Sequence, residues 1–426
     1  ERPEQGDHVT GPELRREPGA ERLGRFGVVE PNDHLFGDAP RRIDRLLAGG
    51  ARQGDDHGRP LPQLQPVSTV TALKPTAAPM LKWPAYGQSA IGTPELGLLG
   101  SSGSQTPVPI ASVTKVVTAL TVLQKNPLAA GHQGPTLTLD TQDVGYYHSY
   151  VAQGGSVVGV TAGEQISQYQ ALQALLLPSA NNMADSLARW AYGSMDSYLS
   201  AANNYLRSQG LRHTKVADAS GFSDQSVSTA EDLVLLGRIA LGEPVIADIV
   251  GQKEASVPVA GIVRSTNWLL GSEGVVGIKT GNTDQAGGCY LFAGQQEIDG
   301  QNVIVIGAIL GAPTLTKAMD DSRGLLTSAY AGFSLTTVVK KGQLLGYYDI
   351  PWAKRINAVA GKDLAVVMWP GRPLKVQTDI QSINATTVKN TRVGGLKTTN
   401  PSSRNIDLVL QESVPAPTWK WRVLRN

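Results

Sequence analysis

The chain has 426 residues, with 38 Lys and Arg against 36 Asp and Glu and a formal net charge of +2 at pH 7. This near-balance gives no support to a nucleic-acid partner, and at roughly 150 residues per domain the length suggests two or three domains. The single cysteine, Cys289, excludes an intrachain disulfide and a cysteine-based zinc site. We see no run of 18 apolar residues and no secretory signal. The low share of charged residues, 17%, favours an extracytoplasmic protein.

Residues 1–75 differ in composition from the rest of the chain. Ten arginines precede Lys74, which is the first lysine. The apolar residues show no sustained period of 2 or 3.6, apart from a short stretch near 43–47. We expect a disordered segment or a linker, or a stretch that results from where the reading frame was taken to begin. We assign it no function.

Residues 76–335 are expected to form one globular domain, entered through the joint "LKPTAAPMLKWPAYG". Helical apolar spacing predicts five helices. The first begins near Ser112, the second covers 168–177 and stops at Pro178, and the third covers 181–190. The fourth follows a capping box at Ser228 and Glu231, and the fifth ends near residue 333. Short apolar runs predict strands at 87–92, 95–101, 274–281, 287–294 and 302–312. A polar turn at Asp299 and Gly300 joins the last two. The element order is that of an α/β domain.

Residues 336–426 are expected to form a small all-β domain. Strand-like runs separated by Gly, Pro and Asn occupy 340–350, 355–369, 374–381 and 406–413. For the end, "PAPTWKWRVLRN", we favour a final strand with two packed tryptophans. The alternative is peripheral contact with a membrane, because Trp favours the interface and Lys420, Arg422 and Arg425 favour anionic lipid.

The first motif that carries chemistry is Ser112-Val-Thr-Lys115, at the start of an apolar helix. Positions i and i+3 of a helix share a face, so the lysine amine is expected beside the serine hydroxyl. A serine hydroxyl becomes a good nucleophile once a base takes its proton. Lysine can be that base if burial or nearby positive charge lowers its pKa. Taken alone, the motif is more simply explained by a surface lysine on a helix.

Two further motifs are equally weak alone. Ser179-Ala-Asn181 lies between two predicted helices, where both side chains can point into one cleft or Asn181 can simply cap the second helix. Lys279-Thr280-Gly281 closes the strand 274–281. A strand edge can pair with a peptide-like substrate, Lys279, Thr280 and Thr283 can hold a carboxylate, and Gly281 allows a close backbone approach.

Together, in this order, the three motifs are characteristic of penicillin-binding proteins and class A β-lactamases. The chain resembles the low-molecular-mass, serine-type D-alanyl-D-alanine carboxypeptidases over roughly 80–335. The resemblance extends to "PIASVTKVVTAL", "LLLPSANNMADSLA", "DASGFSDQSVSTAEDLVLL" and "VVGIKTGNTDQAGGCYLFAG". It implies a β-lactamase/DD-peptidase-like catalytic domain, an antiparallel sheet flanked by helices, at 76–335. The β-rich residues 336–426 resemble the domain that follows the catalytic one in such enzymes.

The resemblance also implies roles. Ser112 would attack the bond between the two terminal D-alanines of a peptidoglycan stem peptide, and Lys115 would take its proton. Ser179 would relay a proton to the leaving amine, Asn181 would orient substrate and base, and Lys279 would attract the terminal carboxylate.

Further implications concern the oxyanion and the ligands. The backbone N–H groups of Ser112 and Asn282 would form an oxyanion hole. β-Lactams would acylate Ser112, and no metal or other cofactor is required. Many relatives carry a basic residue on the helix after the Lys-Thr-Gly strand; Lys317 is the nearest candidate.

Four alternatives stay open. A class A β-lactamase needs a deacylating glutamate, yet no Glu-X-X-Leu-Asn pattern lies between Ser179 and Lys279. A DD-endopeptidase or a transpeptidase differs only in the substrate or acceptor that reaches the acyl-enzyme. The last alternative is a wall-binding protein without catalytic activity. It is disfavoured because such a protein would have no reason to keep the five motif side chains, Ser112, Lys115, Ser179, Asn181 and Lys279. The favoured interpretation places the protein outside the cytoplasm: secreted, periplasmic, or associated with the cell wall or membrane. Cys289 is expected in the core, and Asp218 and Asp224 are expected to shape a loop.

Overall fold

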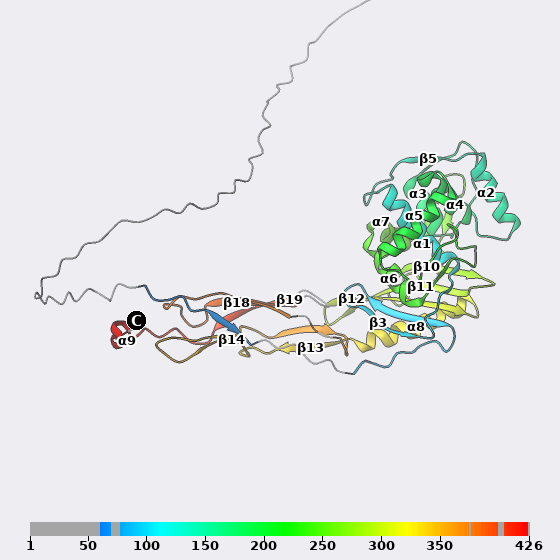
Figure 1. The fold of residues 1–426 in the computed structure, drawn as a ribbon. Helices are drawn as coiled ribbons and strands as arrows, with labels where there is room; N and C mark the ends of the chain where they lie inside the picture. The colour runs from blue at the N-terminus through cyan, green and yellow to red at the C-terminus, as the bar shows by residue number, and fades with distance from the viewer. Residues whose placement is uncertain (1–59, 70–76, 373, 375, 399–403, 425–426) are drawn as a thin grey trace, which may run out of the picture. The chain divides into compact units, whose positions relative to one another are not determined.

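The computed structural model describes residues 60–69, 77–372, 374, 376–398 and 404–424 (Figure 1). All of them belong to one compact unit, Asp56–Asn426. Most of the segment 1–75, predicted to be disordered, lies outside the described residues. Within 60–69 the structure differs from that expectation, because β1 (Pro66–Ser68) pairs with β14 (Leu344–Tyr348). The pairing partner lies almost 280 positions away in sequence, so local patterns could not indicate this strand.

A five-stranded antiparallel sheet lies at the centre of the part of the fold that precedes residue 334. Its strand order is β10-β11-β12-β2-β3. The bounds are Val275–Thr283 for β10, Gly287–Ile298 for β11, Gln301–Ala312 for β12, Gln88–Thr93 for β2 and Gly97–Ser102 for β3. Asp299 and Gly300 both have positive φ and form the tight turn between β11 and β12. The five predicted strands are confirmed, and β10 lies at an edge of the sheet.

The side chains on the two faces of this sheet belong to two different hydrophobic clusters. Leu291 of β11 belongs to the cluster that contains α6 (Ala230–Gly242), whereas its neighbour Tyr290 belongs to the cluster that contains α8 (Leu315–Gly332). Successive residues of a strand point to opposite faces. The sheet is therefore covered on both faces.

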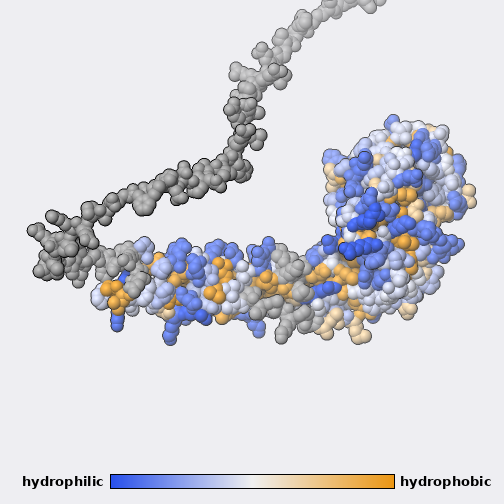
Figure 2. All heavy atoms as spheres, viewed as in Figure 1, coloured by the Kyte–Doolittle hydropathy of each residue, from blue (hydrophilic) through white to orange (hydrophobic). Residues whose placement is uncertain are grey.

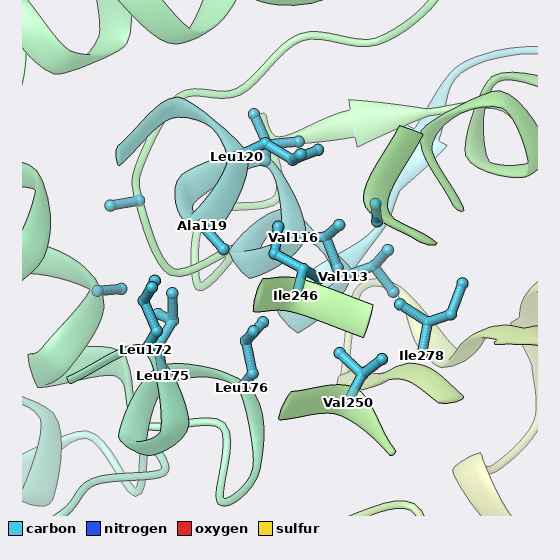
Figure 3. Close-up of a cluster of buried hydrophobic side chains, with 14 of the residues drawn as sticks. Val113, Val116, Ala119, Leu120, Leu172, Leu175, Leu176, Ile246, Val250 and Ile278 are labelled. Carbon is cyan, nitrogen blue, oxygen red and sulfur yellow. The ribbon is translucent and has the colours of Figure 1, made fainter. Parts of the chain in front are cut away.

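A helical layer packs against the α6 face of this sheet. It contains η2 (Ala111–Val113), α1 (Thr114–Lys125), α2 (Thr141–Ala152), α3 (Gln168–Leu176), α4 (Asn181–Tyr192), α5 (Met195–Ser208) and α7 (Pro244–Val250). Figure 3 shows Val116 of α1, Leu176 of α3, Ile246 of α7 and Ile278 of β10 converging on one buried cluster. Short strand pairs connect these helices: β4 (Val108–Pro109) with β7 (Val227–Ser228), β5 (Thr136–Thr138) with β6 (Gln165–Ser167), and β8 (Glu254–Val257) with β9 (Gly261–Arg264).

The predicted capping box at Ser228 and Glu231 is wrong by one residue. Helix α6 has Thr229 as its N-cap, and the Thr229 hydroxyl accepts a hydrogen bond from the Asp232 N–H at 3.1 Å. Ser228 is held extended in β7 by its pairing with Val108. Glu231 instead accepts from the Ser101 hydroxyl at 2.6 Å. A tertiary strand pairing thus shifts the start of the helix.

The residues from 334 onward build two further sheets around a separate hydrophobic cluster. One is the six-stranded sheet β1-β14-β15-β19-β18-β17, and the other pairs β13 with β16. The remaining bounds are Ser334–Val339 for β13, Ile356–Ala360 for β15, Leu364–Met368 for β16, Val376–Ile380 for β17, Arg392–Thr398 for β18 and Arg404–Leu410 for β19. The sequence analysis missed β18, whose Gly-Gly centre is atypical of a strand.

The predicted final strand is also wrong, because the end of the chain forms a short helix, α9 (Trp419–Leu424). The Thr418 hydroxyl accepts from the Trp421 N–H at 3.3 Å, which caps the first turn. Trp421 packs on Trp352 with ring centroids 4.8 Å apart, whereas Trp419 is 69% exposed. No helix among the described residues is long and apolar enough to cross a membrane.

Candidate active site

Ser112 lies in the 3-10 turn η2, directly before α1. The preceding Ala111 has a φ of +46°, a conformation that non-glycine residues rarely adopt. The Ile110 N–H donates to the carbonyl of Ser226 at 3.1 Å, which ties this turn to the loop before α6. Ser112 is only partly buried, while Lys115 one turn later is fully buried. The turn therefore presents the hydroxyl to the surface and the amine beneath it.

The Lys115 amine has three oxygen neighbours: Ser112 Oγ at 2.8 Å, Asn181 Oδ1 at 2.6 Å and the Ser220 carbonyl at 2.7 Å. The last two are carbonyl oxygens, which can only accept hydrogen bonds. A neutral amine has two N–H groups and one lone pair. When both N–H groups donate to the carbonyls, the lone pair is left for the Ser112 hydroxyl. In this arrangement the amine can accept the proton of the Ser112 hydroxyl, which is what a general base does for a nucleophile.

The pKa of Lys115 is suited to that role. Burial lowers it from 10.5 to about 7, and the carboxylates of Asp218 and Asp185 oppose part of this shift. An amine with a pKa near 7 is substantially neutral at neutral pH, which is where a general base works best.

Ser179 lies in the turn between α3 and α4, and Asn181 is the first residue of α4, whose N-cap is Ala180 and not Asn181. Ser179 has a φ of +66°, and the Asn181 N–H donates to the Ser156 carbonyl at 2.7 Å. Lys279 lies 2.9 Å from Ser179 Oγ and donates to the Thr280 carbonyl at 3.0 Å. Burial and the nearby Lys115 amine lower the pKa of Lys279 well below its usual value. The structure therefore brings the three motifs into one polar cluster.

Strand β10 bounds the polar cluster on another side. Thr280 Oγ1 lies 2.6 Å from Thr266 Oγ1, which fixes the Thr280 hydroxyl. Gly281 lies close to η2, the turn that carries Ser112 and is called the nucleophile turn below. A Cβ on Gly281 would meet the Ile110 carbonyl at 3.0 Å and the Ser112 nitrogen at 3.1 Å. A glycine allows this approach without displacing the turn, whereas a side chain would push the two segments apart by a few tenths of an ångström.

An open cleft of about 580 Å³ adjoins the exposed end of β10. Its lining is mostly polar and comprises Gln153, Gly154, Phe222, Ser223, Asp224, Asn282, Thr283, Asp284 and Gln285. Asn282 is exposed, and the Thr283 hydroxyl accepts from the Ala286 N–H at 3.1 Å. The edge position of β10 and this cleft together can receive an extended peptide.

Lys317 does not lie free for a substrate carboxylate. Its amine is 2.5 Å from Asp321 Oδ1 and 5.9 Å from the centre of the Tyr86 ring. Cys289 is fully buried, as expected. Asp218 shapes its loop, as expected, by accepting from the Ser220 and Ser226 hydroxyls at 2.7 and 2.6 Å.

The sequence analysis missed several residues that surround the base. Ser220 contacts Lys115 and Thr266 contacts Thr280 directly, whereas Tyr150 reaches Lys115 through Ser220, and Asp185 through Tyr150 and Ser220. One signal was available, because Asp185 follows Asn181 by four residues, and such pairs share a helix face. Ser220 lies in the stretch "DASGFSD" that carries the family resemblance, whereas Tyr150 and Thr266 carry no sequence signal, since only tertiary packing brings them to the site.

Known proteins share sequence and fold with this chain. The family model described as D-alanyl-D-alanine carboxypeptidase, peptidase S11, matches residues 97–314. The D-alanyl-D-alanine carboxypeptidase DacA of Escherichia coli (strain K12) is 29% identical over 262 residues, which cover 61% of this chain and 64% of DacA. A D-alanyl-D-alanine endopeptidase of Pseudomonas aeruginosa is 28% identical over 58% of this chain and 79% of its own length.

A structural likeness covers more of the chain. Penicillin-binding protein 5 from Haemophilus influenzae superposes with a TM-score of 0.55 at 19% identity, over 82% of this chain and all of that protein. This likeness confirms the predicted β-lactamase/DD-peptidase-like fold. The chain spans a little under two thirds of the length of DacA. Because the family model matches just over half of its residues, the chain belongs to the peptidase S11 family of D-alanyl-D-alanine carboxypeptidases.

Proposed function

We propose that this protein is a serine D-alanyl-D-alanine carboxypeptidase that removes the terminal D-alanine from peptidoglycan stem peptides. The observation that carries the proposal is the environment of the Lys115 amine. Two carbonyl acceptors occupy its N–H groups and its third neighbour is the Ser112 hydroxyl, 2.8 Å away. Family membership supplies the reaction class, since the matching family is that of D-alanyl-D-alanine carboxypeptidases.

In the acylation step, Ser112 Oγ attacks the carbonyl carbon of the penultimate D-alanine while Lys115 takes the hydroxyl proton. The resulting oxyanion is held by the backbone N–H groups of Ser112 and Asn282. Loss of one such donor costs about a hundredfold or more in rate. The C–N bond then breaks, and the leaving amine receives a proton through Ser179. D-Alanine departs, and an ester on Ser112 remains.

Substrate recognition falls to β10 and its neighbours. Lys279 is buried and attracts the terminal carboxylate, whose negative charge favours the protonated amine. The hydroxyls of Thr280 and Thr283 complete the carboxylate site, and Gly281 keeps the backbone close to the nucleophile. Asn181 orients both substrate and base.

In the deacylation step, water attacks the ester and Lys115 again accepts the proton. The shortened peptide leaves and Ser112 is regenerated. β-Lactams would acylate the same serine because they mimic the D-Ala-D-Ala end, and slow hydrolysis of that ester would make them inhibitors.

A DD-endopeptidase activity is the second candidate, and one specific observation favours it. The Pseudomonas aeruginosa relative that matches 58% of this chain is a D-alanyl-D-alanine endopeptidase. A transpeptidase would use the same acyl-enzyme with an amine acceptor. A β-lactamase lacks support, because no glutamate in the expected pattern lies between Ser179 and Lys279.

We propose residues 76–335 as the catalytic domain and 336–426 as a small β-rich domain. Most of the core residues after Ser334 form their own hydrophobic cluster, which supports the division, while Val367 and Trp369 pack into the cluster of α8. Strand β1, from the segment before residue 76, adds to the second domain.

We further propose that the protein works outside the cytoplasm, where its substrate is located, and that its C-terminus contacts the membrane surface. Trp419 and Leu424 of α9 are 69% and 66% exposed, and Lys420 and Arg422 belong to the same short helix. Figure 2 shows orange and blue spheres side by side in the place that Figure 1 labels α9. Trp and basic residues together favour anionic interfaces. Flotation with phosphatidylglycerol vesicles tests this, and a Trp419→Ser variant that binds equally well would contradict it.

The decisive experiment for the activity combines intact mass after penicillin addition with D-alanine release from a stem-peptide mimic. We expect one stable drug adduct, D-alanine release, and loss of both in Ser112→Ala. Cleavage of a crosslinked dimer without D-alanine release would identify an endopeptidase. Rapid return to the unmodified mass with hydrolysed drug would identify a β-lactamase, and no adduct would favour a silent wall-binding protein.

A further inference from the structure

A polar cluster behind the Lys115 amine plays no part in the steps above. We propose that Asp185 is a positioning residue for Lys115: through Tyr150 and Ser220 it fixes the carbonyl that receives a lysine N–H, and its charge favours the protonated amine. This inference rests on the proposed function, in which Lys115 is the base. It deepens that function by naming the residues that control the orientation and the protonation state of the Lys115 amine.

The contacts form a continuous chain from Asp185 to Lys115. Asp185 lies one turn after Asn181 on α4 and is only 9% exposed. The Tyr150 hydroxyl, from α2, donates to Asp185 Oδ2 at 3.0 Å, and its oxygen packs 3.3 Å from Ser220 Oγ, whose own proton goes to Asp218. The fully buried Ser220 offers its carbonyl to the Lys115 amine at 2.7 Å. Two elements far apart in sequence, α2 and α4, thereby hold one carbonyl in place.

Asp218 holds the other side of Ser220. The Ser220 hydroxyl donates to Asp218 Oδ2 at 2.7 Å, and the Phe222 N–H donates to the same oxygen at 2.8 Å. The next residue, Gly221, has a φ of +77°, and a Cβ on it would lie 1.8 Å from the Ala111 carbonyl. The loop therefore packs directly against the turn that carries Ser112, and these contacts position the Ser220 carbonyl.

The charges around Lys115 come from several elements. Asp185 on α4 and Asp218 in the loop favour its protonated form, and Lys279 on β10 has a lowered pKa in the same cluster. Tyr150 on α2 and Tyr198 on α5 are the neighbouring phenols, and burial raises the pKa of both. Burial raises the pKa of Asp185 to about 6, so it is ionised at neutral pH. Its removal leaves less negative charge opposite the amine.

The test is the second-order rate of acylation by a fluorescent penicillin, measured from pH 5 to 9. Asp185→Asn keeps the size and an acceptor for Tyr150 but removes the charge. We expect its half-maximal pH to fall by about half a unit to one unit relative to wild type, with a plateau within about threefold. Tyr150→Phe unlinks Asp185 from Ser220 and is expected to lower the plateau about threefold to tenfold.

A matched control lies elsewhere on the surface. Tyr169 donates to Asp248 in a similar Tyr–Asp pair that has no contact with Lys115. Asp248→Asn is expected to leave the profile unchanged. A profile of Asp185→Asn that is lowered equally at every pH, with an unmoved midpoint, would overturn the proposal and make Asp185 merely structural. Absence of acylation in the wild type itself would instead refute the proposed function, and Ser112→Ala sets that baseline.

Discussion

Replacing Gly281 by alanine tests whether the distance between β10 and the nucleophile turn governs catalysis. A Cβ at this position would meet the Ile110 carbonyl oxygen at 3.0 Å, the Ser112 nitrogen at 3.1 Å and the Ala111 Cβ at 3.2 Å. Carbon atoms rest comfortably about 3.5–4.0 Å from their neighbours, so the strand and the turn must separate by a few tenths of an ångström. Gly281 does not have a positive φ, so the backbone itself is not strained.

The magnitude follows from what that separation disturbs. The proposed oxyanion donors lie on the two segments that would move apart, Ser112 on the turn and Asn282 on the strand. A misplacement of 1 Å costs about a hundredfold, so a shift of a few tenths of an ångström is expected to lower the acylation rate about tenfold. Overpacking is expected to lower the free energy of unfolding by only about 1–2 kcal/mol.

The assay is stopped-flow acylation by a penicillin, with thermal melting of the same sample. Gly251→Ala is the matched control, because a Cβ there would lie 3.5 Å from the Val276 carbonyl of the same strand, an ordinary contact. We expect that variant to acylate like wild type. If Gly281→Ala acylates at the wild-type rate while it melts normally, the close approach of β10 is irrelevant to the reaction and the reasoning fails.

Three further outcomes are expected. Burial lowers the pKa of Lys115 to about 7, so its neutral form predominates above that pH. The acylation rate should therefore rise through pH 7 and become constant above about pH 8. A flat profile from pH 5 to 9 would argue against lysine as the base. Thr266→Val frees the Thr280 hydroxyl 2.6 Å away and should raise KM for a stem-peptide mimic about threefold to tenfold with little change in kcat; an unchanged KM would contradict the link. Arg189→Ala removes the cation 2.7 Å from the buried Asp143 carboxylate, to which the Asp140 N–H still donates, and should lower the free energy of unfolding by about 2 kcal/mol in urea titrations, whereas an unchanged midpoint would show the pair to be neutral.

The sequence by itself determined which side chains meet within the first motif. The i, i+3 spacing of Ser112 and Lys115 places both on one helix face whatever surrounds them. Alternating and periodic apolar residues set the strands and helices of the catalytic region, because burial of one face follows directly from such patterns. The order of three short motifs was specific enough to indicate the family.

The tertiary structure decided what local patterns do not encode. The two carbonyls that orient the Lys115 amine come from Asn181 and Ser220, which lie 66 and 105 positions away in sequence. Burial of that amine lowers its pKa, and burial exists only once α1, α4 and the loop before α6 have packed together. The same limit explains the missed strand β1, the shifted start of α6 and the terminal helix α9. Short segments take the conformation that their distant partners stabilise, since their own propensities amount to only fractions of a kcal/mol per residue.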